Sequence, residues 1–113
     1  MRKIGLRGED IAVSHLKDNG YKILARNWRC ERGELDIVAK DGEILVFVEV
    51  KTRRTDRHGT PAEAVDIRKQ ERLRLLALYY IHQTGTTAPA YRFDVVAVEA
   101  QTEKVTLYKN AFG

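Results

Sequence analysis

Apolar and polar positions alternate along the chain in a way that predicts seven elements. Apolar residues at helical spacing over residues 5–18 indicate a first helix, and Asn19-Gly20 supplies a C-terminal stop. A second helix is predicted from Pro61, which suits a first helical turn, to about residue 83. Alternation and β-branched composition predict strands over residues 21–28, 34–40, 43–50, 91–99 and 104–110.

This order of elements, α-β-β-β-α-β-β, predicts an α/β fold with a central mixed five-stranded sheet flanked by helices. The length of 113 residues is typical of one domain, so residues 1–113 are expected to fold together. Apolar residues make up 43% of the chain, which is enough for one hydrophobic core.

Asp41-Gly42 has the composition of a two-residue hairpin turn, and it sets a register between the strands 34–40 and 43–50. Lys40 then faces Glu43, and facing positions sum to 83; a one-residue bulge would alter this pairing. One face is apolar throughout and is expected to be buried; it carries Leu35, Ile37, Ala39, Ile44, Val46, Val48 and Val50. The other face carries Glu34, Asp36, Val38, Leu45, Phe47, Glu49 and Lys51.

Asp36, Glu49 and Lys51 therefore lie on one face of the hairpin. In this register Asp36 is a diagonal neighbour of Glu49, roughly 7–8 Å away at the backbone, and two carboxylates can converge on one cation from that distance. Such charges more often form a solvated face with incidental ion pairs. The metal-site reading gains because Glu49 interrupts an otherwise apolar strand and a helix is expected to cover the face, where unpaired carboxylates are costly.

Glu9 lies at the centre of the apolar face of the first helix, a face defined by Leu6, Ala12, Val13 and Leu16. A charge at that position needs a partner across the core. It could equally be a carboxylate near the helix N-terminus that favours the helix dipole. Together with the carboxylates of the hairpin, Glu9 is a candidate third acidic ligand.

Basic residues gather in two places that could contact phosphate. Lys69 and Arg72 are predicted inside the apolar arc of the second helix, where they could snorkel as structural side chains, brace the carboxylates or point at a phosphate. Arg53, Arg54 and Arg57 follow Lys51 in a polar loop that could grip a nucleic-acid backbone, although solvated arginine is common in loops.

The overall composition limits the classes of function. A net charge of +4 and a pI near 9.3 permit a polyanionic partner without requiring one. The lone Cys30 favours a reducing compartment, and residues 44–48, the longest apolar run, are too few to span a bilayer. We therefore expect a cytoplasmic protein that does not enter a membrane. The sequence lacks the Gly-rich phosphate-binding loop of an NTPase, and its cysteine and histidines do not have the spacing of a zinc site.

The motifs resemble a known nuclease superfamily. Glu9, the run Gly33-Glu34-Leu35-Asp36-Ile37-Val38-Ala39 and the run Val48-Glu49-Val50-Lys51 resemble the PD-(D/E)xK, or restriction-endonuclease-like, superfamily. The arrangement is most similar to the archaeal Holliday junction resolvases, which also have a glutamate on the first helix. Leu35 stands where the superfamily motif has proline. Over nearly the whole chain the sequence resembles the YraN family of small bacterial proteins, expected to be endonucleases. The stretches that carry this resemblance are residues 26–29, 33–39, 47–53, 92–96 and 110–112.

The resemblance implies a role for each matching residue. Asp36 and Glu49 would be ligands of Mg²⁺ or Mn²⁺, and Glu9 would add a ligand directly or through water. Lys51 would position the attacking water and steady the phosphate. The first hypothesis is then a Mg²⁺-dependent DNA endonuclease, acting on branched or damaged duplexes and, if it cuts junctions, expected to be a homodimer. The alternatives are a nucleic-acid-binding module with little catalysis and a structural protein whose charged cluster is an ion-pair network.

Overall fold

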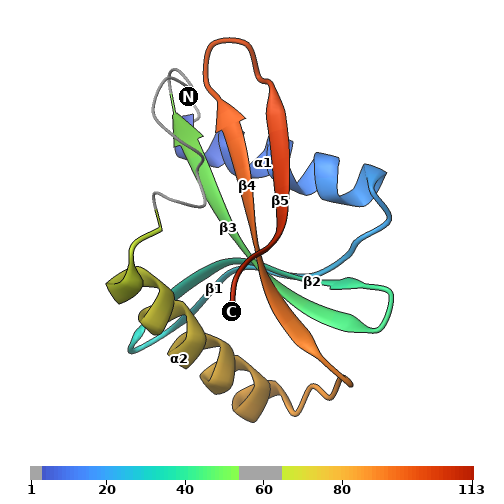
Figure 1. Cartoon of the computed structure of the whole chain (residues 1–113), viewed down its shortest axis with the longest axis vertical. Coiled ribbons are helices and arrows are strands. Elements are labelled where there is room, and N and C mark those ends of the chain that lie inside the picture. The colour runs from blue at the N-terminus through green and yellow to red at the C-terminus, as the bar shows by residue number, and fades with distance from the viewer. Residues whose placement is uncertain (1–3, 54–64) are drawn as a thin grey trace.

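The computed structural model describes residues 4–53 and 65–113, which form the seven expected elements in the expected order (Figure 1). The helices are α1 (Ile4–Asp18) and α2 (Ile67–Thr84). The strands are β1 (Lys22–Cys30), β2 (Gly33–Asp41), β3 (Ile44–Arg53), β4 (Tyr91–Glu99) and β5 (Val105–Phe112). Neither helix, over the residues described, is long and apolar enough to cross a membrane.

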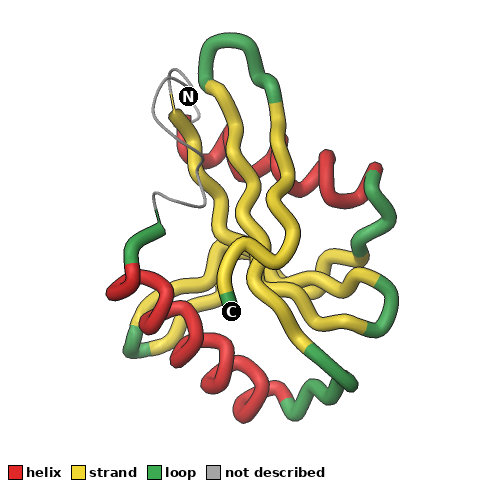
Figure 2. Tube along the Cα trace, viewed as in Figure 1, coloured by secondary structure: helices red, strands yellow, loops and turns green. Residues whose placement is uncertain are grey.

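The five strands form one mixed sheet in the order β1-β2-β3-β4-β5, which confirms the predicted architecture. β3 and β4 are parallel, and the other neighbouring strands are antiparallel. A parallel pair needs a long crossover connection, and α2 lies in that crossover. The two helices lie on opposite faces of the sheet, and the strands twist strongly between them (Figures 1 and 2).

Each face of the sheet has its own hydrophobic cluster. Beneath α1, the side chains of Ala12, Val13 and Leu16 pack against the hairpin face that was expected to be buried. Beneath α2, Leu73, Leu76 and other apolar residues of the helix pack on the opposite face of β2–β3. One side chain departs from the expected division: Leu35 belongs to the α2 cluster and faces Trp28 of β1.

The pairing of β2 with β3 differs from the predicted register by two positions. Asp41 pairs with Ile44, so facing positions sum to 85 and the turn consists of Gly42 and Glu43. Gly42 has a φ of 63°, a left-handed conformation that glycine adopts readily, and Arg92 holds the Asp41 carboxylate at the end of β2. Because the shift is even, the side chains of the paired residues, positions 37–41 and 44–48, keep the faces that were predicted.

The second helix begins six residues later than predicted. Asp66 is its N-cap, since the backbone there is extended and the side chain accepts a hydrogen bond from Lys69 N. Val65, just before the cap, is buried under the helix. The predicted start at Pro61 lies outside the described residues. The helix ends at Thr84, and Gly85 forms the C-cap in a left-handed conformation.

A buried polar network lies beneath the end of the sheet nearest the β2–β3 turn. Asp94 is fully buried on β4, and its carboxylate accepts hydrogen bonds from Tyr21 Oη at 2.7 Å, Arg92 Nε at 2.9 Å and Asn110 N at 2.9 Å. Arg92 also donates to Asp41 of β2 at 2.7 Å. This hydrogen bond and the positive charge hold the pKa of Asp41 below its ordinary value, while burial and Asp94 raise the pKa of Tyr21.

We expect Asp94→Ala to lower the free energy of unfolding by about 3–5 kcal/mol, because it leaves the Tyr21 hydroxyl, Arg92 Nε and Asn110 N without the carboxylate that accepts their hydrogen bonds. Tyr21→Phe removes one donor and should cost only about 1–2 kcal/mol. Urea unfolding followed by circular dichroism measures both values. A loss below about 1 kcal/mol for Asp94→Ala would show that the network is not needed for stability.

Candidate functional site

The hairpin strands β2 and β3 separate at Asp36. Their pairing runs from the turn to Ile37 and Val48, and one further step would set Asp36 opposite Glu49. Here a side chain replaces the backbone carbonyl as hydrogen-bond acceptor: Asp36 Oδ2 accepts a hydrogen bond from Val50 N at 2.9 Å. The carboxylate thus satisfies a backbone donor that the departing strand leaves without a partner.

Asp36 and Glu49 form a close pair of carboxyl groups in a protected position. Glu49 is buried, with 8% of its surface exposed, and Asp36 is partly buried within hydrogen-bonding reach of it. Burial first, then the charge of Glu49 and, more weakly, that of Glu9 raise the pKa of Asp36 well above its ordinary value. Two such groups hold either a shared proton or a cation between them, because both cannot carry an uncompensated charge.

Glu9 approaches this pair from α1. It is 6% exposed, as its place on the apolar face of the helix implied. Its Oε1 accepts hydrogen bonds from Arg26 Nη2 at 3.0 Å and from Asn27 Nδ2 at 2.8 Å. Arg26 also binds Asp10 at 2.7 Å. The cation partner of Glu9 in the structure is therefore an arginine of β1.

Gly8 allows α1 to lie close to β3 at this point. A Cβ on Gly8 would overlap Oγ1 of Thr52. Thr52 follows Lys51 on β3, so the close approach places the first turns of α1 beside the end of the strand that carries Glu49 and Lys51. The helix can therefore bring Glu9 to the gap between the strands.

Lys69 of α2 neutralises Glu49 from the other side. Its Nζ lies 3.1 Å from Glu49 Oε2, and 39% of its side chain is exposed. This contact is one of the roles foreseen for Lys69, that of bracing the carboxylates. Lys51 lies two residues beyond Glu49 on the same face of β3 and is half-buried. The acidic pair is thus bordered by two lysines.

The donor set suits a hard divalent cation, although the acids are not assembled around one. Mg²⁺ and Mn²⁺ take carboxylate oxygens and keep several waters, which Asp36 and Glu49 could provide for. Within residues 4–53 and 65–113, no three acidic, histidine or cysteine side chains are arranged to hold a metal together. Glu9 faces Arg26 and Glu49 faces Lys69, so both contacts would have to loosen for a three-ligand site to form.

The other basic residues occupy different positions. Lys69 and Arg72 line a hollow of about 200 Å³ with Arg68 and Asp66. Arg72 is exposed, as the snorkelling reading of its place on the apolar arc allows. Arg53 is the last residue of β3 and is partly buried opposite Glu99 of β4. Arg54 and Arg57 lie outside the described residues.

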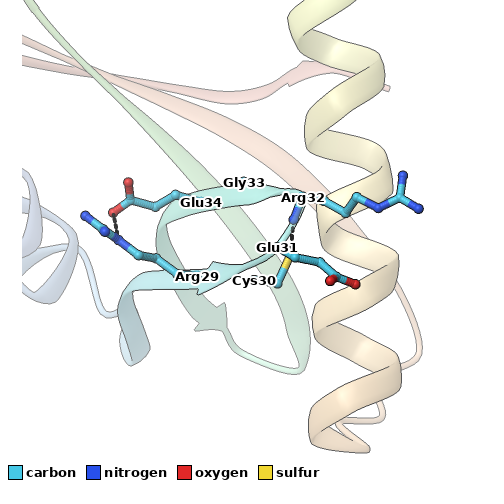
Figure 3. Close-up of a pocket in the computed structure, with 6 residues that line it drawn as sticks. All are labelled: Arg29, Cys30, Glu31, Arg32, Gly33 and Glu34. Atoms are coloured by element: carbon cyan, nitrogen blue, oxygen red, sulfur yellow. Dashed lines mark hydrogen bonds and ion pairs between the residues drawn. The ribbon is translucent and has the colours of Figure 1, made fainter.

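Glu34 does not join the acidic pair, although the predicted register set it opposite Glu49. It forms an ion pair with Arg29 at 3.5 Å across the β1–β2 hairpin, beside a hollow of about 420 Å³ (Figure 3). Arg32 at the turn points the other way and lies over the ring of Tyr79 on α2. The pairing of β2 with β3 ends at Ile37, so Glu34 is paired only with β1, where it lies opposite Arg29.

Residues 8–98 of the chain match the uncharacterised protein family UPF0102. The chain belongs to this family. It is the family that the sequence resembled under the name YraN. A UPF0102 protein of Symbiobacterium thermophilum is 49% identical, over 98% of this chain and 97% of that protein. A relative from Moorella thermoacetica is 49% identical over 98% and 96%, and one from Rhodococcus opacus is 50% identical over 84% and 80%.

The sequence did not reveal the partners of Glu9 in this UPF0102 protein, Arg26 and Asn27. Arg26 and Asn27 were noted only as part of the family resemblance, because their contact with Glu9 depends on how β1 pairs with β2. The contact depends on two backbone features of β1: Asn27 has a left-handed φ of 51°, and the register with β2 shifts between Ile23 and Ala25. Neither the bulge nor the left-handed residue can be located from alternation alone.

We expect Asp36→Asn to raise the free energy of unfolding by about 1–2 kcal/mol in chelator at about pH 8, because it removes one charge from the pair. Asparagine can still accept the Val50 N–H and can donate to Glu49. The gain should shrink toward about pH 4. There the raised pKa keeps Asp36 protonated in the folded protein, and in the unfolded chain the group is already about half protonated, so most of the difference between the two states is gone.

Urea unfolding at the two pH values measures this effect, and Glu34→Gln is the matched control on the same strand. Glu34 is paired with an exposed arginine, so its change should stay within about 0.5 kcal/mol. A loss of stability for Asp36→Asn at about pH 8 would show that the carboxylate pair is a favourable structural element.

Proposed function

We propose that this UPF0102 protein is a Mg²⁺- or Mn²⁺-dependent nuclease of restriction-endonuclease-like fold that hydrolyses DNA phosphodiesters. The observation that carries the proposal is the pair Asp36 and Glu49, held together where β2 and β3 separate. A structural protein would gain little from placing two acids side by side in a protected position, since their repulsion costs stability. A divalent cation turns the same arrangement into a favourable one.

The residues would divide the chemistry as follows. Asp36 and Glu49 would hold the cation, and Glu9 would supply a third oxygen directly or through water once Arg26 releases it. When bound, the metal would neutralise phosphate charge and lower the pKa of its water. Lys51, on the same face of β3, would orient the attacking water and donate to the phosphate.

The basic side chains around the pair support a polyanionic substrate. Lys69, Arg72 and Arg68 line one hollow at the start of α2, on the side where Lys69 reaches Glu49. Phosphate contacts from such residues position a nucleic acid without reading its sequence. The resemblance to Holliday junction resolvases favours branched DNA as the substrate and a homodimer as the working form.

A second candidate function is a nucleic-acid-binding module that has the nuclease fold and little catalysis. The observation in its favour is that Glu9 and Glu49 already have cationic partners, Arg26 and Lys69. If those ion pairs are permanent, the basic residues could bind a phosphate backbone while no metal enters. Cleavage and metal binding separate the two functions.

With Mg²⁺ or Mn²⁺, we expect the protein to cut at least one DNA in a panel of linear, nicked and four-way duplexes. Glu49→Gln should lower the rate by about 10³-fold or more, because it removes a metal ligand. Lys51→Ala should lower the rate by about 10²–10⁴-fold through loss of proton-transfer assistance. Gel assays under single-turnover conditions measure these rates.

Glu34→Gln controls for a change of acid on the hairpin and should cut at the wild-type rate. If no DNA in the panel is cut while the protein still binds DNA with a steep dependence on salt, the binding-module function replaces the nuclease. Cleavage that persists in Glu49→Gln would show that another site or a contaminant performs it.

We further expect Lys69→Met to tighten the binding of Mn²⁺ by roughly threefold to tenfold, because the lysine ammonium competes with the metal for Glu49. Isothermal titration calorimetry measures the affinity in the absence of DNA. Arg72→Met is the matched control, since Arg72 lines the same hollow but has no contact with Glu49. Weaker binding by Lys69→Met would show that the lysine supports the metal site.

A further inference from the structure

The outward side of α2 carries apolar residues that the sheet does not use. Leu75 is 42% exposed and Leu78 is 54% exposed, and both point away from the core formed by Leu73, Leu76 and Tyr80. One helical turn beyond each leucine lies a polar residue, Glu71 before Leu75 and His82 after Leu78. We call these four residues, Glu71, Leu75, Leu78 and His82, the outer stripe.

The spacing of the outer stripe reads the same in both directions. The steps from Glu71 to Leu75, from Leu75 to Leu78 and from Leu78 to His82 are four, three and four residues. This is the seam spacing by which two helices pack along their lengths. A two-fold axis crossing the helix between residues 76 and 77 maps each position of the stripe onto another position of the stripe.

That symmetry pairs complementary side chains. In an antiparallel pair of α2 helices, Leu75 of one copy would face Leu78 of the other, and Glu71 would face His82. Glu71 and His82 are both exposed, and neither side chain has a hydrogen bond or ion pair with another described residue. A carboxylate and an imidazole can form a hydrogen bond across such a contact, whichever copy supplies each group.

We propose that the outer stripe is the interface of a homodimer, in which two copies of α2 pack antiparallel around a two-fold axis. A closed two-fold interface uses the same surface on both copies and must be complementary to itself. The four-residue pattern meets that condition, with leucines at the centre and the acid opposite the histidine at each end. Ile67, which is 67% exposed, lies on the same side of the helix one turn before Glu71.

The proposed interface leaves the candidate site open. Lys69 and the residues that reach the sheet lie on the opposite side of α2 from the stripe, so two copies can associate without covering Glu49. A single pair of helices buries less than the roughly 1,600 Å² of a standard stable interface, so the dimer should dissociate on the order of tens of micromolar or above.

Sedimentation velocity over about 10–500 µM protein tests the interface, and the expected result is a shift from one chain to two across that range. Leu78→Glu should weaken association by at least about tenfold, because it buries a charge against leucine. Leu24→Glu is the matched control: Leu24 is 37% exposed on β1, away from the stripe, and this change should leave association as in wild type.

A charge exchange tests the antiparallel arrangement itself. Glu71→Arg should weaken association several-fold, and adding His82→Glu should restore it, because arginine would then face glutamate across the axis. A protein that stays monomeric at about 500 µM would overturn the proposal. So would equal weakening by Leu24→Glu, or a double variant no stronger than the single one. Association is measured without metal or DNA, so its outcome is independent of the nuclease test.

Discussion

The hydrogen bond from Val50 N to Asp36 Oδ2 is the contact on which the candidate site depends. Two strands that part leave backbone donors facing a gap, and such groups must be satisfied. Here the donor takes a carboxylate, which fixes the direction of the Asp36 side chain at the point where Glu49 stands opposite. The end of the β2–β3 pairing therefore also brings the carboxyl groups of Asp36 and Glu49 together.

The two helices then supply charge from opposite faces of the sheet. α1 brings Glu9, which Arg26 of β1 neutralises, and α2 brings Lys69, which neutralises Glu49. Burial and the charge of Glu49 raise the pKa of the remaining acid, Asp36, so it takes up a proton more readily than an exposed aspartate. The two ion pairs and this raised pKa limit the repulsion among the three acids.

The sequence predicted the elements and the faces well, because both depend on local periodicity. The predicted register of the hairpin was wrong by two positions, and a shift by an even number does not move a side chain to the other face of the sheet. For that reason Asp36 and Glu49 were correctly placed together. Glu9 was recognised because a charge on an apolar helical face is conspicuous.

The features that the sequence did not predict depend on contacts between residues that are far apart in the chain. Leu35 packs in the α2 cluster and Glu34 pairs with Arg29, because at these two positions β2 is paired with β1 and no longer with β3. The network of Asp94 with Tyr21 joins residues 73 positions apart, and no local pattern announces it.

The parallel pairing of β3 with β4 has a consequence for how the chain folds. Leu45 pairs with Tyr91, 46 positions later, whereas Asp41 pairs with Ile44 across a two-residue turn. Closing a long loop costs more entropy and slows folding, so we expect the hairpin to form first. During synthesis the edge of β3 that pairs with β4 would stay unpaired until residues 91–99 leave the ribosome. That interval is when the nascent chain is most exposed to aggregation.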